Sequence, residues 1–125
     1  MPHVFVYGTL KRGGENHRVL AGQRFVGEAR TAPAFRLYLL DGYPGMVPAA
    51  DGREIRGEVW EVDPACLERL DELEGTAAGL YARMPVRLAP PHDALAAETY
   101  LYRRSVAGRA DLGTWFDPGG FSHPG

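Results

Sequence analysis

The chain begins with the run His3-Val4-Phe5-Val6-Tyr7-Gly8-Thr9-Leu10-Lys11-Arg12-Gly13-Gly14, in which a hydrophobic segment stops at a glycine and a loop with two more glycines follows. Val, Phe and Tyr favour a β-strand over residues 3–7, and Gly8 ends it. The loop leaves backbone N–H groups without a ladder partner, and glycine admits a ligand closely because no Cβ stands in the way. The run therefore predicts either a site for an anionic or carbonyl-bearing ligand or a glycine-rich turn that binds nothing.

Composition and charge are those of an ordinary globular protein. The chain has 125 residues, of which 45% are hydrophobic and 24% charged, and we expect one domain over residues 1–125. A net charge of -2 with scattered Lys and Arg argues against nucleic acid and anionic membranes as partners. The single cysteine excludes an intrachain disulfide. Because neither a secretory signal nor an apolar stretch of roughly 20 residues is visible, we expect a cytoplasmic protein.

The pattern along the chain indicates many short strands and few helices. Asp63-Pro64 is a strong helix start, since Asp caps the N-terminus and Pro fits the first turn, and Gly75 is a suitable end. This balance predicts an α+β fold with a small curved sheet, mixed or antiparallel, that closes into a barrel-like domain with one or two short helices. We expect strands over 3–7, 24–31, 35–40, 54–62, 81–88 and 98–104, a short helix over 15–21, a turn over 41–45 and an irregular tail over 108–125.

Glu74 interrupts the apolar face of the helix predicted over 64–74. With successive residues about 100° apart, Glu74 falls between Leu67 and Leu70, on the stripe that also holds Leu73 and Cys66. Burial and the negative end of the helix dipole would both raise the pKa of this carboxyl toward the range useful for a general acid or base. The alternative is a frayed terminus with Glu74 turned into water.

Other motifs exclude several chemistries. Gly14 and Glu15 stand where a phosphate-binding loop needs Lys and Ser or Thr, so nucleoside triphosphate binding is not expected. Asp71, Glu72 and Glu74 spread over different helix faces, which indicates a solvated acidic end and not a metal site. The four histidines show no metal-ligand spacing, and we expect neither a metal nor an organic cofactor. We interpret Cys66 as a buried small hydrophobe.

The turn Tyr43-Pro44-Gly45 is interpreted as a simple turn whose tyrosine is able to close over a pocket.

Five stretches, taken in order, match a known family: Val4-Phe5-Val6-Tyr7-Gly8-Thr9-Leu10-Lys11-Arg12-Gly13, Asn16-His17-Arg18-Val19-Leu20, Gly57-Glu58-Val59-Trp60-Glu61-Val62-Asp63, Leu70-Asp71-Glu72-Leu73-Glu74-Gly75 and Leu80-Tyr81-Ala82-Arg83. They resemble the gamma-glutamylcyclotransferase-like family, and most closely its small gamma-glutamylamine cyclotransferase branch. The resemblance covers most of residues 4–88 and fades after Arg104. It implies that Tyr7, Gly8, Thr9 and Leu10 line the substrate pocket and that Glu74 is the catalytic acid/base. We also expect Tyr81 and Arg83 to border the pocket.

The resemblance implies a small-molecule γ-glutamyl substrate whose own α-amine attacks the γ-carbonyl and releases 5-oxoproline and a free amine. Two other functions stay open at this point. One is a non-catalytic module that binds a carboxylate in the same pocket, and the other is cyclotransfer on a carrier-bound γ-glutamyl group, which requires a wide pocket mouth. The leaving amine and the oligomeric state are not indicated by the sequence.

Overall fold

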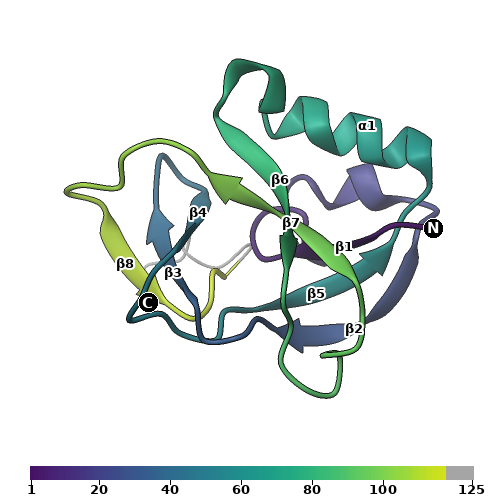
Figure 1. The fold of residues 1–125 in the computed structure, drawn as a ribbon. Helices are drawn as coiled ribbons and strands as arrows, with labels where there is room; N and C mark the ends of the chain where they lie inside the picture. The colour runs from purple at the N-terminus through teal and green to yellow at the C-terminus, as the bar shows by residue number, and fades with distance from the viewer. Residues whose placement is uncertain (118–125) are drawn as a thin grey trace.

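The structure is a computed structural model that describes residues 1–117. Over these residues the chain forms eight strands, one α-helix and two short 3-10 helices in an α+β arrangement (Figure 1). In chain order the elements are β1 (His3–Val6), η1 (His17–Leu20), β2 (Arg24–Arg30), β3 (Phe35–Leu39), β4 (Pro44–Pro48), β5 (Arg56–Glu61), α1 (Pro64–Leu73), η2 (Thr76–Ala78), β6 (Tyr81–Val86), β7 (Ala97–Tyr102) and β8 (Ala110–Gly113).

Strand β1 lies at the centre of the larger, five-stranded sheet, whose order is β2-β5-β1-β7-β6. It pairs antiparallel with β5 and parallel with β7, so the sheet is mixed. Because β1 is central, the loop that starts at Gly8 leaves the middle of the sheet and not its edge. This position brings the loop next to residues from both halves of the chain.

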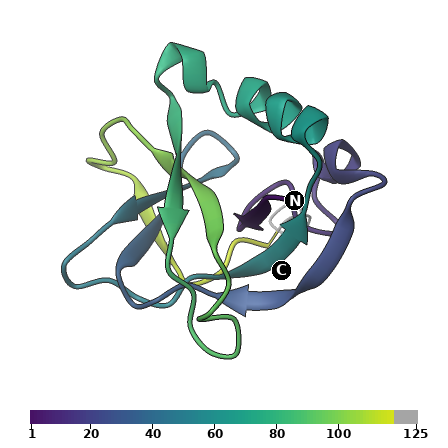
Figure 2. The ribbon, with the colours of Figure 1, turned by 45° about the vertical axis from the view of Figure 1, so that its right-hand side comes forward.

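The alternation of side chains along β1 explains why it is buried on both faces. Phe5 and Tyr7 pack into one hydrophobic cluster with Leu37 and Met46 of the smaller sheet. Val4 and Val6 point the other way, into a second cluster that includes Cys66 and Leu70 of α1. The first strand therefore carries α1 on one side and the smaller sheet on the other, as the ribbon shows (Figure 2).

Helix α1 begins and ends where the sequence predicts. The side chain of Asp63 accepts a hydrogen bond of 2.7 Å from the backbone N–H of Cys66, and Pro64 occupies the first turn. At the other end Glu74 is the C-cap, and Gly75 takes a left-handed conformation with φ of 66°. Only a residue without Cβ adopts this conformation at little cost, so Gly75 ends the helix immediately after Glu74.

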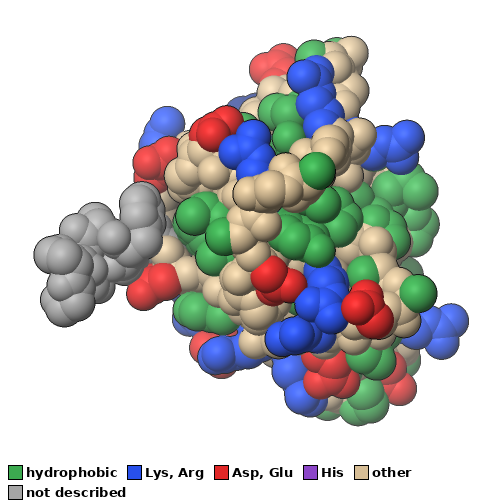
Figure 3. Space-filling view, turned by 90° about the vertical axis from the view of Figure 1, so that its left-hand side faces the viewer, with side chains coloured by type: hydrophobic (Ala, Val, Ile, Leu, Met, Phe, Trp, Pro, Cys, Tyr) green, Lys and Arg blue, Asp and Glu red, His purple; other side chains and the backbone are tan. Residues whose placement is uncertain are grey.

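The smaller sheet has three strands in the order β4-β3-β8 and corrects two sequence predictions. The turn predicted over 41–45 continues directly into β4, since Pro44 and Gly45 belong to that strand. The tail predicted to be irregular over 108–125 contains β8, which pairs with β3, while residues 118–125 lie outside the described residues. Figure 3 shows the molecule from the left-hand side of Figure 1, with hydrophobic side chains among charged ones of both signs.

The predicted α+β class with a mixed sheet is confirmed. Closure into a barrel stays an expectation, but the two edges of the larger sheet do meet at one point, just beyond β2 and β6. There the N–H of Ala32 donates to the carbonyl of Arg87 (2.9 Å) and the N–H of Ala89 donates to that of Arg30 (2.8 Å). The helix predicted over 15–21 is the shorter 3-10 turn η1.

In residues 1–117 no helix is long and apolar enough to span a bilayer.

Candidate active site

A cavity of about 290 Å³ opens between the end of β1, the end of α1 and strands β6 and β7. Six of the seven residues expected at the site line it: Tyr7, Gly8, Thr9, Leu10, Glu74 and Tyr81. They come from three separate parts of the sequence, and the fold brings them to one cavity. The other lining residues are Phe5, Val6, Glu15, Asn16, Tyr43, Pro44, Leu73, Leu80 and Tyr100.

The loop after β1 is held in one shape by its own hydrogen bonds. The N–H of Asn16 donates to the carbonyl of Thr9 (3.0 Å), and the side-chain amide of Asn16 donates to the Thr9 hydroxyl at the same distance. Gly14 must be glycine, because a Cβ there would lie 2.1 Å from the carbonyl oxygen of Thr9. A Cβ on Gly8 would lie 2.6 Å from Cγ of Pro44.

This loop leaves three backbone donors unused at the cavity wall. Within residues 1–117 the N–H groups of Gly8, Thr9 and Leu10 have no acceptor, whereas the next N–H, that of Lys11, donates to the carbonyl of Gly8 (3.1 Å). Unpaired N–H groups beside a cavity are suited to bind a carboxylate or a developing oxyanion.

Glu74 projects from the last turn of α1 into the same cavity. Desolvation raises the pKa of its carboxyl to about 7. In the described part of the chain no donor reaches the carboxylate, and no cation pairs with it. Burial therefore leaves Glu74 able both to take up and to release a proton near neutral pH, which suits a general acid or base.

Three tyrosines surround Glu74, and each donates its hydroxyl proton to another part of the protein. Tyr7 donates to the carbonyl of Tyr100 (2.6 Å), Tyr81 to that of Pro44 (2.8 Å), and Tyr100 to the carboxylate of Asp71 (2.6 Å). Burial is the main cause that raises the pKa of all three phenols, and the charge of Glu74 adds to it. The tyrosines stay neutral, and the hydroxyl proton of each is engaged in a hydrogen bond to the protein.

Arg83 does not line the cavity, contrary to the prediction. Its guanidinium pairs with Asp71 (2.9 Å) and with Glu98 (2.7 Å). Asp71 in turn accepts the hydroxyl proton of Tyr100, which does line the cavity. Arg83 therefore does not contact the cavity itself and is linked to it only through Asp71 and Tyr100.

The acidic end of α1 also differs from the prediction of a solvated cluster. Glu72 is exposed, but Asp71 and Glu74 are partly buried in different surroundings. Leu73, predicted on the buried stripe, is 40% exposed at the cavity. Residues 1–117 contain no group of three His, Cys, Asp or Glu side chains arranged to hold a metal ion.

Sequence reasoning missed Asn16 and Tyr100 as site residues. Asn16 lies inside a stretch that matches the family, and its place after the glycine loop was a usable signal. Tyr100 carried no local signal, because only the parallel pairing of β7 with β1 brings it beside Tyr7. Tyr43, foreseen as able to cover a pocket, does line the cavity.

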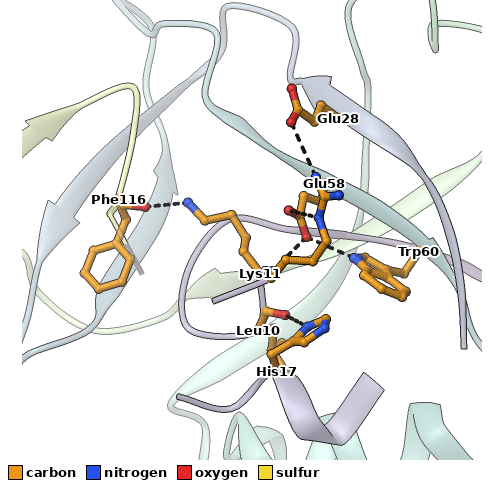
Figure 4. Close-up of polar contacts among 8 residues, drawn as sticks. Leu10, Lys11, His17, Glu28, Glu58, Trp60 and Phe116 are labelled. Atoms are coloured by element: carbon orange, nitrogen blue, oxygen red, sulfur yellow. Dashed lines mark hydrogen bonds and ion pairs between the residues drawn. The ribbon is translucent and has the colours of Figure 1, made fainter. Parts of the chain in front are cut away.

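Next to Arg12, and outside the lining of this cavity, lies a second carboxylate with the opposite character. Glu58 is 5% exposed and accepts hydrogen bonds from the backbone N–H (3.1 Å) and Nε (2.9 Å) of Arg12 and from Nε1 of Trp60 (3.1 Å). Lys11, next to Arg12, donates to the carbonyl of Phe116 (Figure 4). These contacts fix the loop to β5 and to the segment after β8.

The sequence and the structure are similar to those of known proteins. A sequence model described as "Gamma-glutamyl cyclotransferase, AIG2-like" matches residues 4–117. The chain belongs to this family. A gamma-glutamylcyclotransferase family protein of Citrobacter rodentium, ytfP, is 34% identical over 116 residues, which make up 91% of this chain and 95% of that protein. The crystal structure of an AIG2-like protein from Mus musculus superposes with a TM-score of 0.80 at 28% identity, covering 97% of this chain and 92% of that one.

Two other relatives are matched over only part of their own length. A gamma-glutamylcyclotransferase relative from Arabidopsis thaliana is 41% identical over 96 residues, or 69% of this chain but only 50% of that protein. A Vibrio cholerae relative is 44% identical over 71 residues, which are 57% of this chain and 60% of that protein. The chain thus spans one half to three fifths of these two relatives.

Proposed function

We propose that this protein is a γ-glutamyl cyclotransferase that converts a γ-glutamyl amine or γ-glutamyl peptide into 5-oxoproline and a free amine. The α-nitrogen of the γ-glutamyl group attacks its own γ-carbonyl carbon, and a C–N bond forms that closes a five-membered ring. The bond from that carbon to the leaving nitrogen breaks. Two protons move from the α-ammonium to the leaving nitrogen, so the amine departs as an ammonium ion and no co-reactant is consumed.

Because the attack is intramolecular, the protein has two tasks: to hold the substrate in a folded conformation and to move protons. Glu74 takes a proton from the α-ammonium, which frees the lone pair for attack, and then delivers a proton to the leaving nitrogen. One carboxyl performs both transfers only when its pKa lies near the working pH, and the pKa of about 7 meets this condition.

The N–H groups of Gly8, Thr9 and Leu10 bind a negatively charged part of the substrate, either its α-carboxylate or the oxyanion that forms at the γ-carbonyl. Such donors stabilise developing charge most when they are fixed before the reaction begins. The hydrogen bonds between Asn16 and Thr9 hold the loop in this way. Tyr7 and Tyr81 form the walls that contact the γ-glutamyl chain.

The observation that carries the proposal is the shared cavity: a buried carboxylate without a partner faces a loop with unpaired N–H groups. A purely structural carboxylate in such a position costs stability and gains nothing in return. Membership of the family supports the same reaction class.

The test is release of 5-oxoproline from a γ-glutamyl amine and from a γ-glutamyl dipeptide by the wild type, by Glu74→Gln and by Glu72→Gln. Glu72 is the matched control, since it lies on the same helix but is exposed outside the cavity. We expect turnover in the wild type and in Glu72→Gln, and loss of most turnover in a folded Glu74→Gln. Tight binding of these compounds without product would instead identify a carboxylate-binding module.

A further inference from the structure

The cavity lining holds more hydrogen-bond acceptors than the proposed reaction needs. Its described lining includes the carboxylates of Glu15 and Glu74 but no Lys or Arg side chain. Tyr7, Tyr81 and Tyr100 belong to the same lining, and the hydroxyl of each donates its hydrogen bond to a protein acceptor. A hydroxyl that donates elsewhere presents only lone pairs to a ligand. The wall around Glu74 is therefore built to accept hydrogen bonds.

Tyr100 differs from the other two tyrosines because its hydroxyl donates a hydrogen bond to a charged group. Its hydroxyl donates to Oδ1 of Asp71 at 2.6 Å, while Tyr7 and Tyr81 donate to neutral carbonyls. A hydrogen bond to a carboxylate is stronger than one to a carbonyl and polarises the phenol, so its oxygen becomes a better acceptor. Tyr7 also accepts from the N–H of Met46 (3.2 Å), which uses part of its remaining capacity.

Asp71 is itself held in place. Nε of Arg83 lies 2.9 Å from Oδ1 of Asp71 and Nη2 lies 3.3 Å from Oδ2, so the guanidinium grips both oxygens. Glu98 of β7 holds the other side of Arg83 at 2.7 Å. Asp71 is three residues before Glu74 on α1, and its bond to Tyr100 ties that end of the helix to the strand beneath the cavity.

We propose that the Tyr100 hydroxyl oxygen, together with Glu74, receives the α-ammonium group of the ligand, and that Asp71 is the positioning residue that aims and polarises it. An ammonium has three donors and needs several acceptors once water is displaced. This inference rests on the proposed function and deepens it, since it names the part of the substrate that binds at this end of the cavity.

The alternative is that the network of Asp71, Arg83 and Tyr100 only fastens α1 to the sheet. A fastening role would change stability but would not distinguish a ligand with an α-amine from one without it. Binding is therefore measured in the Glu74→Gln background, which removes turnover. The two probes are γ-L-glutamyl-n-butylamide and glutaric acid mono-n-butylamide, which has the same skeleton but no α-amine.

The measured quantity is the ratio of the two dissociation constants by calorimetry. We expect Glu74→Gln to prefer the amine-bearing probe, and Tyr100→Phe added to it to reduce that preference by about tenfold, the typical effect of a hydrogen bond to a charged group. Tyr102→Phe is the matched control, because Tyr102 belongs to the same strand and packs against Tyr81 but does not line the cavity. Its preference should equal that of the parent.

Asp71→Asn keeps an acceptor for the Tyr100 hydroxyl but loses the charge, so it should give an intermediate ratio. Glu98→Gln alters the network at its far end and should leave the ratio unchanged. An unchanged ratio in both Tyr100→Phe and Asp71→Asn, or an equal loss in Tyr102→Phe, would overturn the proposal. Failure of the wild type to form 5-oxoproline is a separate readout that bears on the proposed function and not on the probe ratio.

Discussion

Two glutamates lie near the loop that follows β1 and differ in almost every respect: Glu58 is buried and bonded to Arg12, whereas Glu74 is partly buried and lines the cavity. Glu58 accepts three hydrogen bonds, two of them from Arg12, whereas the carboxylate of Glu74 accepts none from the described residues. Desolvation raises the pKa of Glu74 to about 7. The comparison teaches that burial alone does not assign a role to a carboxylate: its partners decide whether it stabilises the fold or stays free for chemistry.

The largest expected difference between the two glutamates is in the rate. Glu74→Gln should lower kcat/KM for 5-oxoproline release by about 10²–10⁴, the usual contribution of general acid–base catalysis. Glu58→Gln should reduce it far less in the fraction of protein that remains folded, because Glu58 contacts the loop through Arg12 and does not line the cavity. Steady-state kinetics with circular dichroism as a check on folding compares them. Similar losses in both variants would mean that the comparison is wrong.

Stability should show the reverse order. Glu58→Ala removes the acceptor for Nε1 of Trp60 and for two donors of Arg12, and breaking a buried ion pair from one side costs about 3–5 kcal/mol. Arg12 is itself 47% exposed, which places the expected loss in unfolding free energy at the lower end of that range. Urea unfolding measures it. A loss below about 1 kcal/mol would show that the Glu58 contacts are replaceable by water.

The pH dependence of stability sharpens the comparison. The pKa of Glu74 rises from 4.5 to about 7 on folding, so the folded state binds this proton more tightly than the unfolded chain. Its contribution is therefore most favourable below pH 4.5 and is lost as the pH rises through about 7. At about 1.4 kcal/mol for each pKa unit, the loss is about 3 kcal/mol.

Urea unfolding of the wild type and of Glu74→Gln at several pH values between 4.5 and 8 tests this prediction. The difference in unfolding free energy between the two proteins should shift in favour of Glu74→Gln as the pH rises. Parallel curves for the two proteins would mean that Glu74 titrates with its ordinary pKa and is more solvated than the cavity suggests.

The smallest expected effect concerns the hydrogen bond between Asn16 and Thr9, in the part of the loop that lines the cavity. Asn16→Ala removes the bond of 3.0 Å to the Thr9 hydroxyl but leaves the backbone bond between the same residues. A single hydrogen bond of this kind contributes about 1 kcal/mol, so KM should rise about fivefold with kcat little changed. Thr9→Val, which removes the other partner, should give the same result. A larger change in kcat than in KM would assign Asn16 a part in the chemistry.

The sequence by itself determined the features that depend on near neighbours. Asp63 and Pro64 start α1, Gly75 ends it, and the position of Glu74 between Leu67 and Leu70 predicts a carboxylate turned toward the interior. The strand that ends at Gly8 is equally local, since it follows from β-propensity and from a glycine. Capping and periodicity act over a few residues, and a single sequence carries them in full.

Only the tertiary structure decided which distant segments meet. The pairing of β1 with β7 places Tyr100 in the cavity, and α1 and β6 together bring Asp71 to Arg83. Strand β4 was not predicted from the sequence, because Pro44 and Gly45 are typical turn residues and form a strand only through pairing with β3. These contacts join residues far apart in the chain, and their register is fixed by packing on both faces of the central strand and not by any local preference.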